Sequence, residues 1–283
     1  MEPARRPNEE QTTLWNGLGG RGWVEAQAAL DRVLRPFEDL LVESVAVAPG
    51  NRVLDVGCGT GSTTLAFARV VGANGRAVGV DISEPMLAMA RERAEQERAP
   101  ATFVHADAQV HAFEPASFDA IVSRFGVMFF DDTARAFTNL RRAARAGAEL
   151  RFVAWRSAAD NPFMTAAERA VAPLLPNLPA RDPDAPGQFA FADRSRVRRT
   201  LEQSGWTGVD VAPIDVICTF SEQDLHRYLT RVGPIGRVLQ ESDDRTRARI
   251  TEALRSAFAP YVDGADVRFT GACWRVGARA PAA

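Results

Sequence analysis

The sequence contains no lysine, so all 34 of its basic residues are arginines. No lysine can therefore act as a base or as a Schiff-base nucleophile. Cysteine is also scarce, because the chain has only Cys58, Cys218 and Cys273, which lie far apart. No pair of them has the spacing of metal ligands, and an oxidising compartment is not indicated. We predict no metal site.

Long apolar runs and an excess of cations are missing as well. No run approaches the roughly 20 apolar residues that a transmembrane helix needs, and the charged N-terminus lacks the apolar core of a signal peptide. The formal net charge is −2, whereas nucleic-acid-binding domains normally carry clustered cations. We therefore expect a cytoplasmic protein without a membrane span or a nucleic-acid partner. A homodimer stays open.

The most informative stretch is Asn51-Arg-Val-Leu-Asp-Val-Gly-Cys-Gly-Thr-Gly61. Its apolar residues predict a short buried parallel strand. The glycines that follow allow the backbone to turn sharply and to approach a ligand closely before a helix begins at Ser62. The dinucleotide fingerprint places its third glycine five residues after the first, but here the distance is four. Asp55, just ahead of the glycines, favours a cationic ligand group over a diphosphate.

Val53-Leu-Asp-Val-Gly-Cys-Gly-Thr-Gly61 resembles the first motif of the class I S-adenosylmethionine (SAM)-dependent methyltransferases. Three further motifs follow in order. A strand at 76–80 leads to Asp81, which can accept hydrogen bonds from both ribose hydroxyls. Phe103-Val-His-Ala-Asp107-Ala108 resembles the motif that reads adenine, and 118–130 resembles the strand and loop that lead to the methyl group. The resemblance is specific across about 51–155.

This resemblance implies SAM as the cofactor and S-adenosylhomocysteine as the product. It also implies methyl transfer to the O, N or C nucleophile of a small organic acceptor, as in the ubiquinone/menaquinone-biosynthesis-like branch, mainly by proximity and orientation. The residues predicted to bind the cofactor are Asp55, Gly57, Cys58, Gly59, Gly61, Asp81, Ile82, Met86, Asp107, Ala108, Ser123 and Trp15. Those predicted to contact the acceptor are Phe125, Phe129, Trp155, Tyr228 and Arg231.

Alternating strands and helices predict a doubly wound, mostly parallel sheet with right-handed crossovers. The resemblance completes it as a seven-stranded Rossmann-like α/β fold with an antiparallel last strand. We expect a SAM-binding domain at 51–283, after an N-terminal region at 1–50. In that region Pro36 is expected to kink or split a helix at 24–47. Gly147 is expected to end a helix at about 132–145, before a strand at 149–155.

Segments outside the motifs are predicted to enclose the site. Residues 1–10 are expected to form a mobile tail. The stretch 12–23 places Trp15 and Trp23 among four glycines, too flexible for a core helix and too aromatic for a linker. We interpret it as a flap that covers the cofactor. An alternative stays open, in which the two tryptophans only fasten the first helix to the domain as a structural staple. Insertions at about 157–192 and 219–262 are predicted to form a helical substrate cap.

The histidines offer one candidate for acid–base chemistry. His226 lies on a predicted inserted helix, where it could face the acceptor, whereas His105 and His111 fit ordinary strand and loop positions. The sequence does not decide whether a base is used. Two alternatives remain open: a methyltransferase acting on RNA or protein, and a protein that binds SAM without transferring the methyl group.

Overall fold

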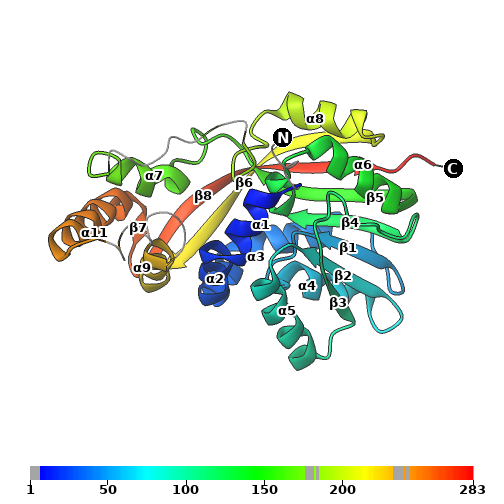
Figure 1. The fold of residues 1–283 in the computed structure, drawn as a ribbon, viewed down its shortest axis with the longest axis horizontal. Coiled ribbons are helices and arrows are strands. Elements are labelled where there is room, and N and C mark those ends of the chain that lie inside the picture. Colours follow the sequence, from blue (N-terminus) through cyan, green and yellow to red (C-terminus); the bar gives the residue numbers. More distant parts are fainter. Residues whose placement is uncertain (1–6, 176–181, 183–184, 232–238, 240–241, 283) are drawn as a thin grey trace, which may run out of the picture.

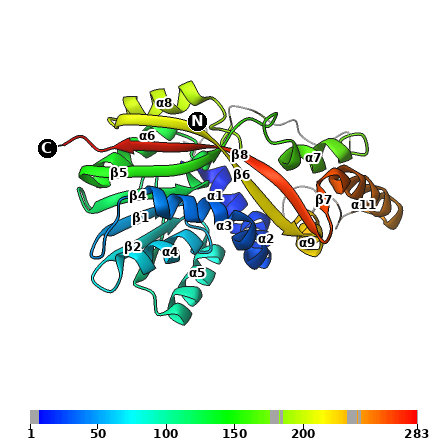
Figure 2. The same ribbon diagram turned by 180° about the vertical axis from the view of Figure 1, so that it is seen from behind.

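The computed structural model describes residues 7–175, 182, 185–231, 239 and 242–282. It shows one mixed sheet with helices on both faces (Figure 1 and, from behind, Figure 2). This confirms the predicted Rossmann-like α/β fold.

The sheet has the strand order β3-β2-β1-β4-β5-β8-β6, in which β1 to β5 run parallel and β8 is antiparallel to both of its neighbours. A short extra strand, β7, pairs with β8, so the sheet has eight strands where seven were predicted. The strands are β1 (Arg52–Val56), β2 (Arg76–Asp81), β3 (Ala101–His105), β4 (Phe118–Arg124), β5 (Ala144–Trp155), β6 (Thr207–Ser221), β7 (Val262–Asp263) and β8 (Asp266–Arg279).

Helices cover both faces of this sheet. Thr64 of α4 donates a hydrogen bond to Asp55 of β1, whereas Phe137 of α6 stacks on Phe152 of β5. These two strand residues point to opposite faces, because Asp55 pairs with Val122 and Phe152 pairs with the next residue, Ser123. The helices are α1 (Glu9–Asn16), α2 (Leu18–Glu25), α3 (Gln27–Ser44), α4 (Ser62–Val71), α5 (Glu84–Glu97), α6 (Thr133–Ala143), α7 (Pro162–Val171), α8 (Arg194–Gln203), α9 (Glu222–Arg231) and α11 (Asp244–Phe258), with short 3-10 turns η1 (Gly126–Phe129) and η2 (Ala259–Tyr261).

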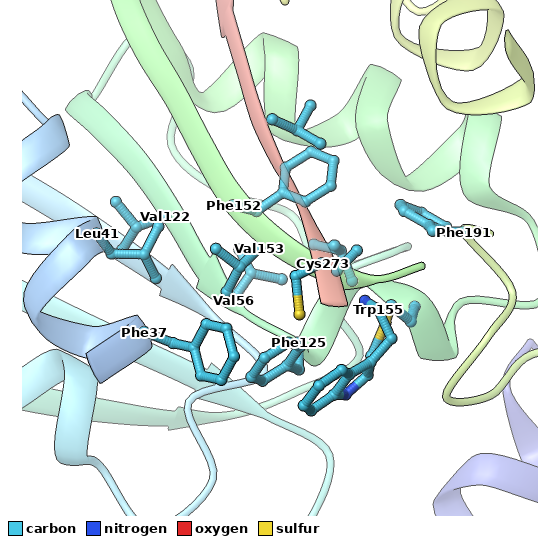
Figure 3. Packing of buried hydrophobic residues seen from close by; sticks show 14 of the residues in the cluster. Phe37, Leu41, Val56, Val122, Phe125, Phe152, Val153, Trp155, Phe191 and Cys273 are labelled. Carbon is cyan, nitrogen blue, oxygen red and sulfur yellow. The ribbon is translucent and has the colours of Figure 1, made fainter. Parts of the chain in front are cut away.

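Helix α3 continues through Pro36, so the helix is not split there. A proline inside a helix costs one hydrogen bond and roughly 3 kcal/mol. The apolar face of α3 compensates, because Leu34, Phe37 and Leu41 are all buried. Figure 3 shows Phe37 pointing into the core, where its ring packs edge-on against Phe125 at 5.0 Å between centroids. Burial of such side chains contributes about 1.5–3 kcal/mol each, which outweighs the cost of Pro36.

Gly147 lies within β5 rather than at the end of a helix, which corrects a second prediction. Helix α6 already ends at Ala143, and β5 begins at the next residue. The pairing of β4 with β5 shifts from Phe118↔Ala144 to Ala120↔Glu149, and Gly147 falls in this irregularity with a φ of +76°. Glycine adopts that left-handed conformation without steric cost.

The N-terminal region is helical and packed from Asn8 onward, contrary to the expected mobile tail at 1–10. Residues 1–6 lie outside the described part of the chain. Asn8 is only 4% exposed and precedes α1, and α2 follows after a break at Gly17. The glycines of 12–23 therefore do not prevent helix formation. We call residues 8–25 the N-terminal cover.

Strands β6 and β8 form a long antiparallel pair that extends beyond the rest of the sheet and carries α7, α9 and α11 near its far end (Figures 1 and 2). We call this pair the hairpin, although α9, α11 and β7 lie between its two strands in the chain. Aromatic side chains join these elements. The ring of Phe163 in α7 stacks on Phe269 in β8 with centroids 3.8 Å apart, and Phe258 of α11 meets Phe163 edge-on at 5.1 Å. We call α7, α9, α11 and the far half of the hairpin the cap.

Candidate functional site

A pocket of about 430 Å³ opens where β1, β2, β4 and β5 end, at the carboxyl edge of the parallel strands. This is where open α/β sheets bind their ligands. The N-terminal cover, α3 and the cap supply its other walls. The lining consists of Asn8, Leu14, Trp15, Gly19, Trp23, Leu30, Val33, Leu34, Val56, Gly57, Cys58, Gly59, Thr60, Val80, Asp81, Ile82, Met86, Ala106, Asp107, Ala108, Arg124, Phe125, Gly126, Met128, Phe129, Phe130, Trp155, Phe163, Met164, Gln188, Phe220 and Phe269.

The glycine loop and Asp81 form one end of the pocket and hold each other in place. The Asp81 carboxylate accepts hydrogen bonds from the backbone N–H of Gly59 at 2.8 Å and of Ser83 at 2.9 Å. Burial raises the pKa of Asp81, and these donors oppose the rise. Gly59 has a φ of +54°, and a Cβ atom there would lie 2.7 Å from the terminal methyl of Met86. The loop conformation therefore requires glycine.

Asp107 lies on the same side of the pocket, beyond β3. One of its oxygens, Oδ1, accepts hydrogen bonds from the Asn8 side chain and from the backbone N–H of Gln109, both at 2.9 Å. The other oxygen, Oδ2, is buried and has no hydrogen-bond partner among the described residues. Leaving a buried acceptor unpaired is costly, so this oxygen is available to a donor on a ligand.

Three of the predicted cofactor residues stand behind the lining and support it. Asp55 points toward α4, where Thr64 donates to it at 2.6 Å, and burial raises its pKa to about 7. Ser123 donates to the carbonyl of Val56 at 2.7 Å and accepts from the backbone N–H of Gly126 at 3.1 Å, which fastens η1 to β1. Gly61 begins α4 with a φ of +85°. Side chains alternate along a strand, so Val56 faces the pocket and Asp55 does not.

Aromatic rings form the other end of the pocket, as the sequence predicts for the region beyond β4 and β5. Phe125 and Trp155 stack with centroids 4.5 Å apart and planes within 5°. Trp15 meets Phe129 edge-on at 5.2 Å and Trp23 at 6.0 Å. The side chains of Tyr228, Arg231 and His226 lie outside the described residues, although α9, which carries them, is placed.

The N-terminal cover is tied to the loops that follow β2 and β3. The Asn16 amide donates to the carbonyl of Ile82 at 2.7 Å and accepts from the backbone N–H of Glu84 at 3.0 Å. Ser83 donates to the carbonyl of Trp15 at 2.6 Å, and Asn8 exchanges hydrogen bonds with Asp131. These bonds hold Trp15 over the pocket.

Sequence reasoning missed four polar residues of the lining, Asn8, Thr60, Arg124 and Gln188. Asn8 carries no signal, because it lies in a charged segment that reads as a tail. Arg124 carries a signal that was overlooked: it is charged and directly follows the buried end of a parallel strand. Its side chain is 9% exposed and approaches Glu38 of α3 at 3.7 Å.

The structure also places the other two histidines of the sequence. His105 is half-exposed and its Nε2 lies 3.0 Å from the carbonyl of Ile82, whereas the His111 ring packs on Phe113 at 4.7 Å. Neither lines the pocket. Within the described residues, no His, Cys, Asp or Glu side chains cluster in a way that could hold a metal ion. No helix in that part of the chain is both long and apolar enough to span a bilayer.

Comparison with known proteins links this geometry to a family. Residues 53–147 match the family described as "Methyltransferase domain". An uncharacterized protein of Mycobacterium tuberculosis is 29% identical over 192 residues, which cover 67% of this chain and 66% of that protein. The demethylmenaquinone methyltransferase of Shouchella clausii is 34% identical over 110 residues, 38% of this chain and 47% of that enzyme. The chain thus spans less than two thirds of these relatives.

Another relative and two solved structures extend the likeness. The ubiquinone/menaquinone biosynthesis C-methyltransferase of Teredinibacter turnerae is 28% identical over 186 residues, 61% of this chain and 73% of that enzyme. The YcgJ protein of Bacillus subtilis matches with a TM-score of 0.59 and 17% identity, over 88% of this chain and all of that one. A putative methyltransferase of Bacillus halodurans matches with a TM-score of 0.57 and 23% identity, over 86% and 98% of the two chains. These structures show the shared fold.

The four ordered motifs meet at one pocket, and the domain match covers the first strand through the start of the fifth. The relatives with assigned names are methyltransferases. Residues 53–147 therefore form a methyltransferase domain, and the chain is similar to the ubiquinone/menaquinone C-methyltransferases.

Proposed function

We propose that the protein transfers the methyl group of SAM to a small, largely apolar acceptor. The observation that supports this best is the continuity of the pocket, which runs from Asp81 and Asp107 at one end to a wall of aromatic rings at the other. A cofactor and an acceptor bound in one such pocket would be held next to each other. Two relatives are named for methyl transfer in quinone biosynthesis, which supports an organic small-molecule acceptor.

The residues at the first end fit an adenosine cofactor. The Asp81 carboxylate stands at the end of β2, where it can accept hydrogen bonds from ribose hydroxyls, and Gly59 keeps the loop free of a side chain. The unpartnered Oδ2 of Asp107 suits the exocyclic amine of adenine. When bound, SAM supplies a methyl group on a sulfonium, which is electrophilic without further activation.

The chain's own contribution is enclosure and alignment. Trp15 and Trp23 from the cover, with Phe125 and Trp155 from the sheet, exclude water and restrict the acceptor to a few orientations. Holding two reactants in a reactive arrangement accelerates a reaction without acid–base chemistry. It also protects a charged, reactive group from hydrolysis.

No described lining residue is placed as a free base. Both oxygens of Asp81 accept hydrogen bonds, and Oδ2 of Asp107 is assigned to adenine in this proposal. Burial raises the pKa of the Cys58 thiol well above its usual value. Arg124 offers hydrogen-bond donors only. The proposal therefore relies on an acceptor whose nucleophile is reactive through its own acidity or lone pair. His226 remains a predicted alternative.

The N-terminal cover and the cap flank the pocket and its lining is mostly apolar, which argues against an RNA or protein substrate. A protein that only binds SAM stays as the second candidate. One experiment separates the three: the protein is incubated with labelled SAM and a panel of phenols, quinols and amines, and with RNA and protein at low and high salt. Label transfer to a small molecule supports the proposal, whereas transfer to a macromolecule alone, or binding without any transfer, contradicts it.

Binding of the cofactor is tested separately by calorimetry with S-adenosylhomocysteine. Asp81→Asn removes a charged acceptor that is poised for two hydroxyls, so its affinity should fall by about 30-fold or more. His105→Asn is the matched control, since it changes a half-exposed side chain beside the same loop. Equal affinity of Asp81→Asn and the parent protein would contradict the assignment of the cofactor end.

A further inference from the structure

Arg124 is a largely buried cation on the pocket wall that makes no hydrogen bond to the described residues through its Nη1. Its side chain is 9% exposed, and its Nη1 is buried without a hydrogen-bond partner among the described residues. The nearest carboxylate oxygen, Oε2 of Glu38, lies 3.7 Å away, which is too far for a hydrogen bond. A guanidinium offers five donors in a fixed fork, so this arrangement is expensive unless something else pairs with it.

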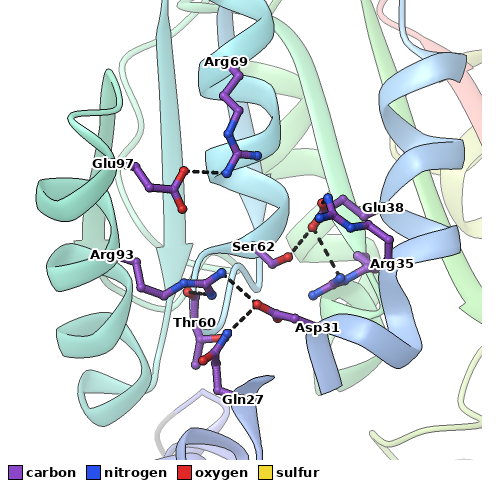
Figure 4. Close-up of polar contacts among 10 residues, drawn as sticks. Gln27, Asp31, Arg35, Glu38, Thr60, Ser62, Arg69, Arg93 and Glu97 are labelled. Atoms are coloured by element: carbon purple, nitrogen blue, oxygen red, sulfur yellow. Dashed lines mark hydrogen bonds and ion pairs between the residues drawn. The ribbon is translucent and has the colours of Figure 1, made fainter. Parts of the chain in front are cut away.

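Glu38 already accepts a hydrogen bond from another partner at each of its oxygens. Oε1 accepts from Nη1 of Arg35 at 3.0 Å, and Oε2 accepts a hydrogen bond from the Ser62 hydroxyl. Figure 4 shows both interactions converging on Glu38 from α3 and from the start of α4. Glu38 itself is only 3% exposed. One buried carboxylate thus serves two arginines, of which only Arg35 obtains a hydrogen bond.

The neighbouring carboxylates do not give Arg124 a close counter-charge. Asp55 is a second carboxylate that interacts electrostatically with Arg124, and the arginine lowers its pKa. Asp55 is committed to Thr64 at 2.6 Å and does not line the pocket. Its pKa of about 7 also leaves it only partly ionised at neutral pH. A buried cation without a full counter-charge is unfavourable, and an anion that entered from the pocket would correct this.

We propose that Arg124 is the anion-binding group of the pocket, and that its guanidinium holds the carboxylate of a bound small molecule. Bidentate pairing with a carboxylate is the geometry for which arginine is best suited. This inference rests on the proposed function, because it names the chemistry of a ligand of that same pocket. Two ligands can supply the carboxylate: the amino-acid end of the cofactor, or an acidic acceptor.

The two sources are separated by matched ligand pairs. S-adenosylhomocysteine carries the amino-acid carboxylate, whereas 5′-methylthioadenosine keeps the adenosine and the sulfur but lacks it. For the acceptor side, 4-hydroxybenzoate is compared with the neutral 4-hydroxybenzamide, with and without saturating S-adenosylhomocysteine. Affinities are measured by calorimetry, so the result does not depend on turnover.

Three variants distinguish a loss of ligand binding from a loss of folding. Arg124→Met removes the charge and keeps most of the stem. The double variant Arg124→Met/Glu38→Gln also removes the carboxylate that would otherwise be left with less charge compensation. Arg35→Met is the control, because Arg35 pairs with the same Glu38 but is 60% exposed and does not line the pocket.

If the carboxylate belongs to the cofactor, Arg124→Met should bind S-adenosylhomocysteine about tenfold or more weakly and 5′-methylthioadenosine as the parent does. If it belongs to the acceptor, both adenosine ligands should bind unchanged, and the preference for the benzoate over the benzamide should disappear. Arg35→Met should preserve every affinity. The assignment of Arg124 is overturned if the two Arg124 variants bind all four ligands like the parent.

Failure of the proposed function would look different. A parent protein that bound neither adenosine ligand would contradict a methyltransferase role. The benzoate and benzamide pair, titrated without any adenosine ligand, would then still decide whether Arg124 binds anions.

Discussion

Asp55 couples the stability of the fold to pH through its burial under the glycine loop. Its pKa rises from 3.8 to about 7 in the folded chain, chiefly because of burial. The folded state therefore keeps a proton, over the range between about pH 4 and pH 7, that the unfolded chain has released. By linkage, the free energy of unfolding falls as pH rises through this window.

Asp55→Asn should weaken this pH dependence. The amide is always neutral and its carbonyl can still accept the hydrogen bond from Thr64. We expect the parent to lose stability between pH 5 and pH 8, and the variant to lose less, by on the order of a few kcal/mol. Urea denaturation at the two pH values measures the difference. Asp81, whose pKa is also raised, leaves the variant some slope, but parallel losses in both proteins would contradict the role of Asp55.

Gly59 and Gly50 provide a matched test of why the glycine loop needs its glycines. Both have a positive φ, +54° and +92°, so valine should destabilise the fold at either position by roughly 1–2 kcal/mol or more. A Cβ atom at Gly50 would meet no atom within 4 Å, whereas one at Gly59 would press on Met86 at the pocket wall. Gly59→Val should therefore lose affinity for S-adenosylhomocysteine in calorimetry, and Gly50→Val should keep it. A folded Gly59→Val that binds normally would remove the loop from the site.

At the residue scale, the sequence predicts those side chains whose position depends on near neighbours in the chain. Gly57, Gly59, Asp81 and Asp107 follow directly after strands, and all of them line the pocket. Contacts made across long separations leave no periodic trace. Asn8 reaches Asp107 over 99 residues. Such partners could not be predicted from spacing alone.

At the scale of secondary-structure elements, α1 and α2 are joined to the pocket by hydrogen bonds more than by burial. α1 has no buried residues, and α2 buries only Gly20 and Gly22. The bonds from Asn16 and Ser83 fix the segment to the loop after β2. A cover of this kind can open without unfolding the sheet, which fits a flap better than a staple.

Trp15→Ala tests this interpretation. The ring contacts Trp23 and Phe129 at the pocket, so its loss should speed dissociation of S-adenosylhomocysteine by about tenfold while lowering Tm by only a few degrees. Stopped-flow displacement and thermal melting give the two quantities. Leu18→Ala is the control, since Leu18 is 56% exposed on the neighbouring helix. Should binding decline only in proportion to the folded fraction, the segment is a structural staple.

The sequence predicts where a helix or strand begins or ends when one local signal dominates. It does not do so when a local signal and tertiary packing favour different outcomes. Helix α4 follows the glycine loop and begins at Ser62, as predicted. Pro36 does not split its helix and Gly147 does not end one, because the effect of each local breaker is decided by distant packing. Phe37 buries its ring against Trp155, and β4 pairs with β5 on both sides of Gly147.

At the scale of the whole molecule, the pocket joins two differently built halves. The cofactor end rests on β1, β2 and their loops, whereas Phe163, Phe220 and Phe269 reach the pocket from the cap. Their rings stack on one another, with Phe220 and Phe269 6.1 Å apart between centroids. We therefore expect the two ligands to respond to mutations in different halves.

Phe163→Leu should raise the KM for an acceptor several-fold and leave the Kd of S-adenosylhomocysteine unchanged, because a similar apolar side chain keeps the fold while altering the pocket wall. Steady-state kinetics on a true acceptor and calorimetry measure the two constants. Phe258→Leu is the control: it lies in the same cluster, 5.1 Å from Phe163, but outside the pocket lining. A matched fall in cofactor affinity would show that the halves are not separable.

The hairpin that carries the cap also has a consequence for how such a protein can change over time. The cap is built from segments inserted after β5 and between β6 and β8, while every motif for the cofactor precedes Arg156. Insertions and deletions in those two segments can therefore accumulate without displacing the glycine loop. The same separation predicts the behaviour of a chimaeric protein in which the cap of a relative replaces the cap of this chain. The chimaera should have the acceptor specificity of the relative and the affinity of this chain for the methyl donor.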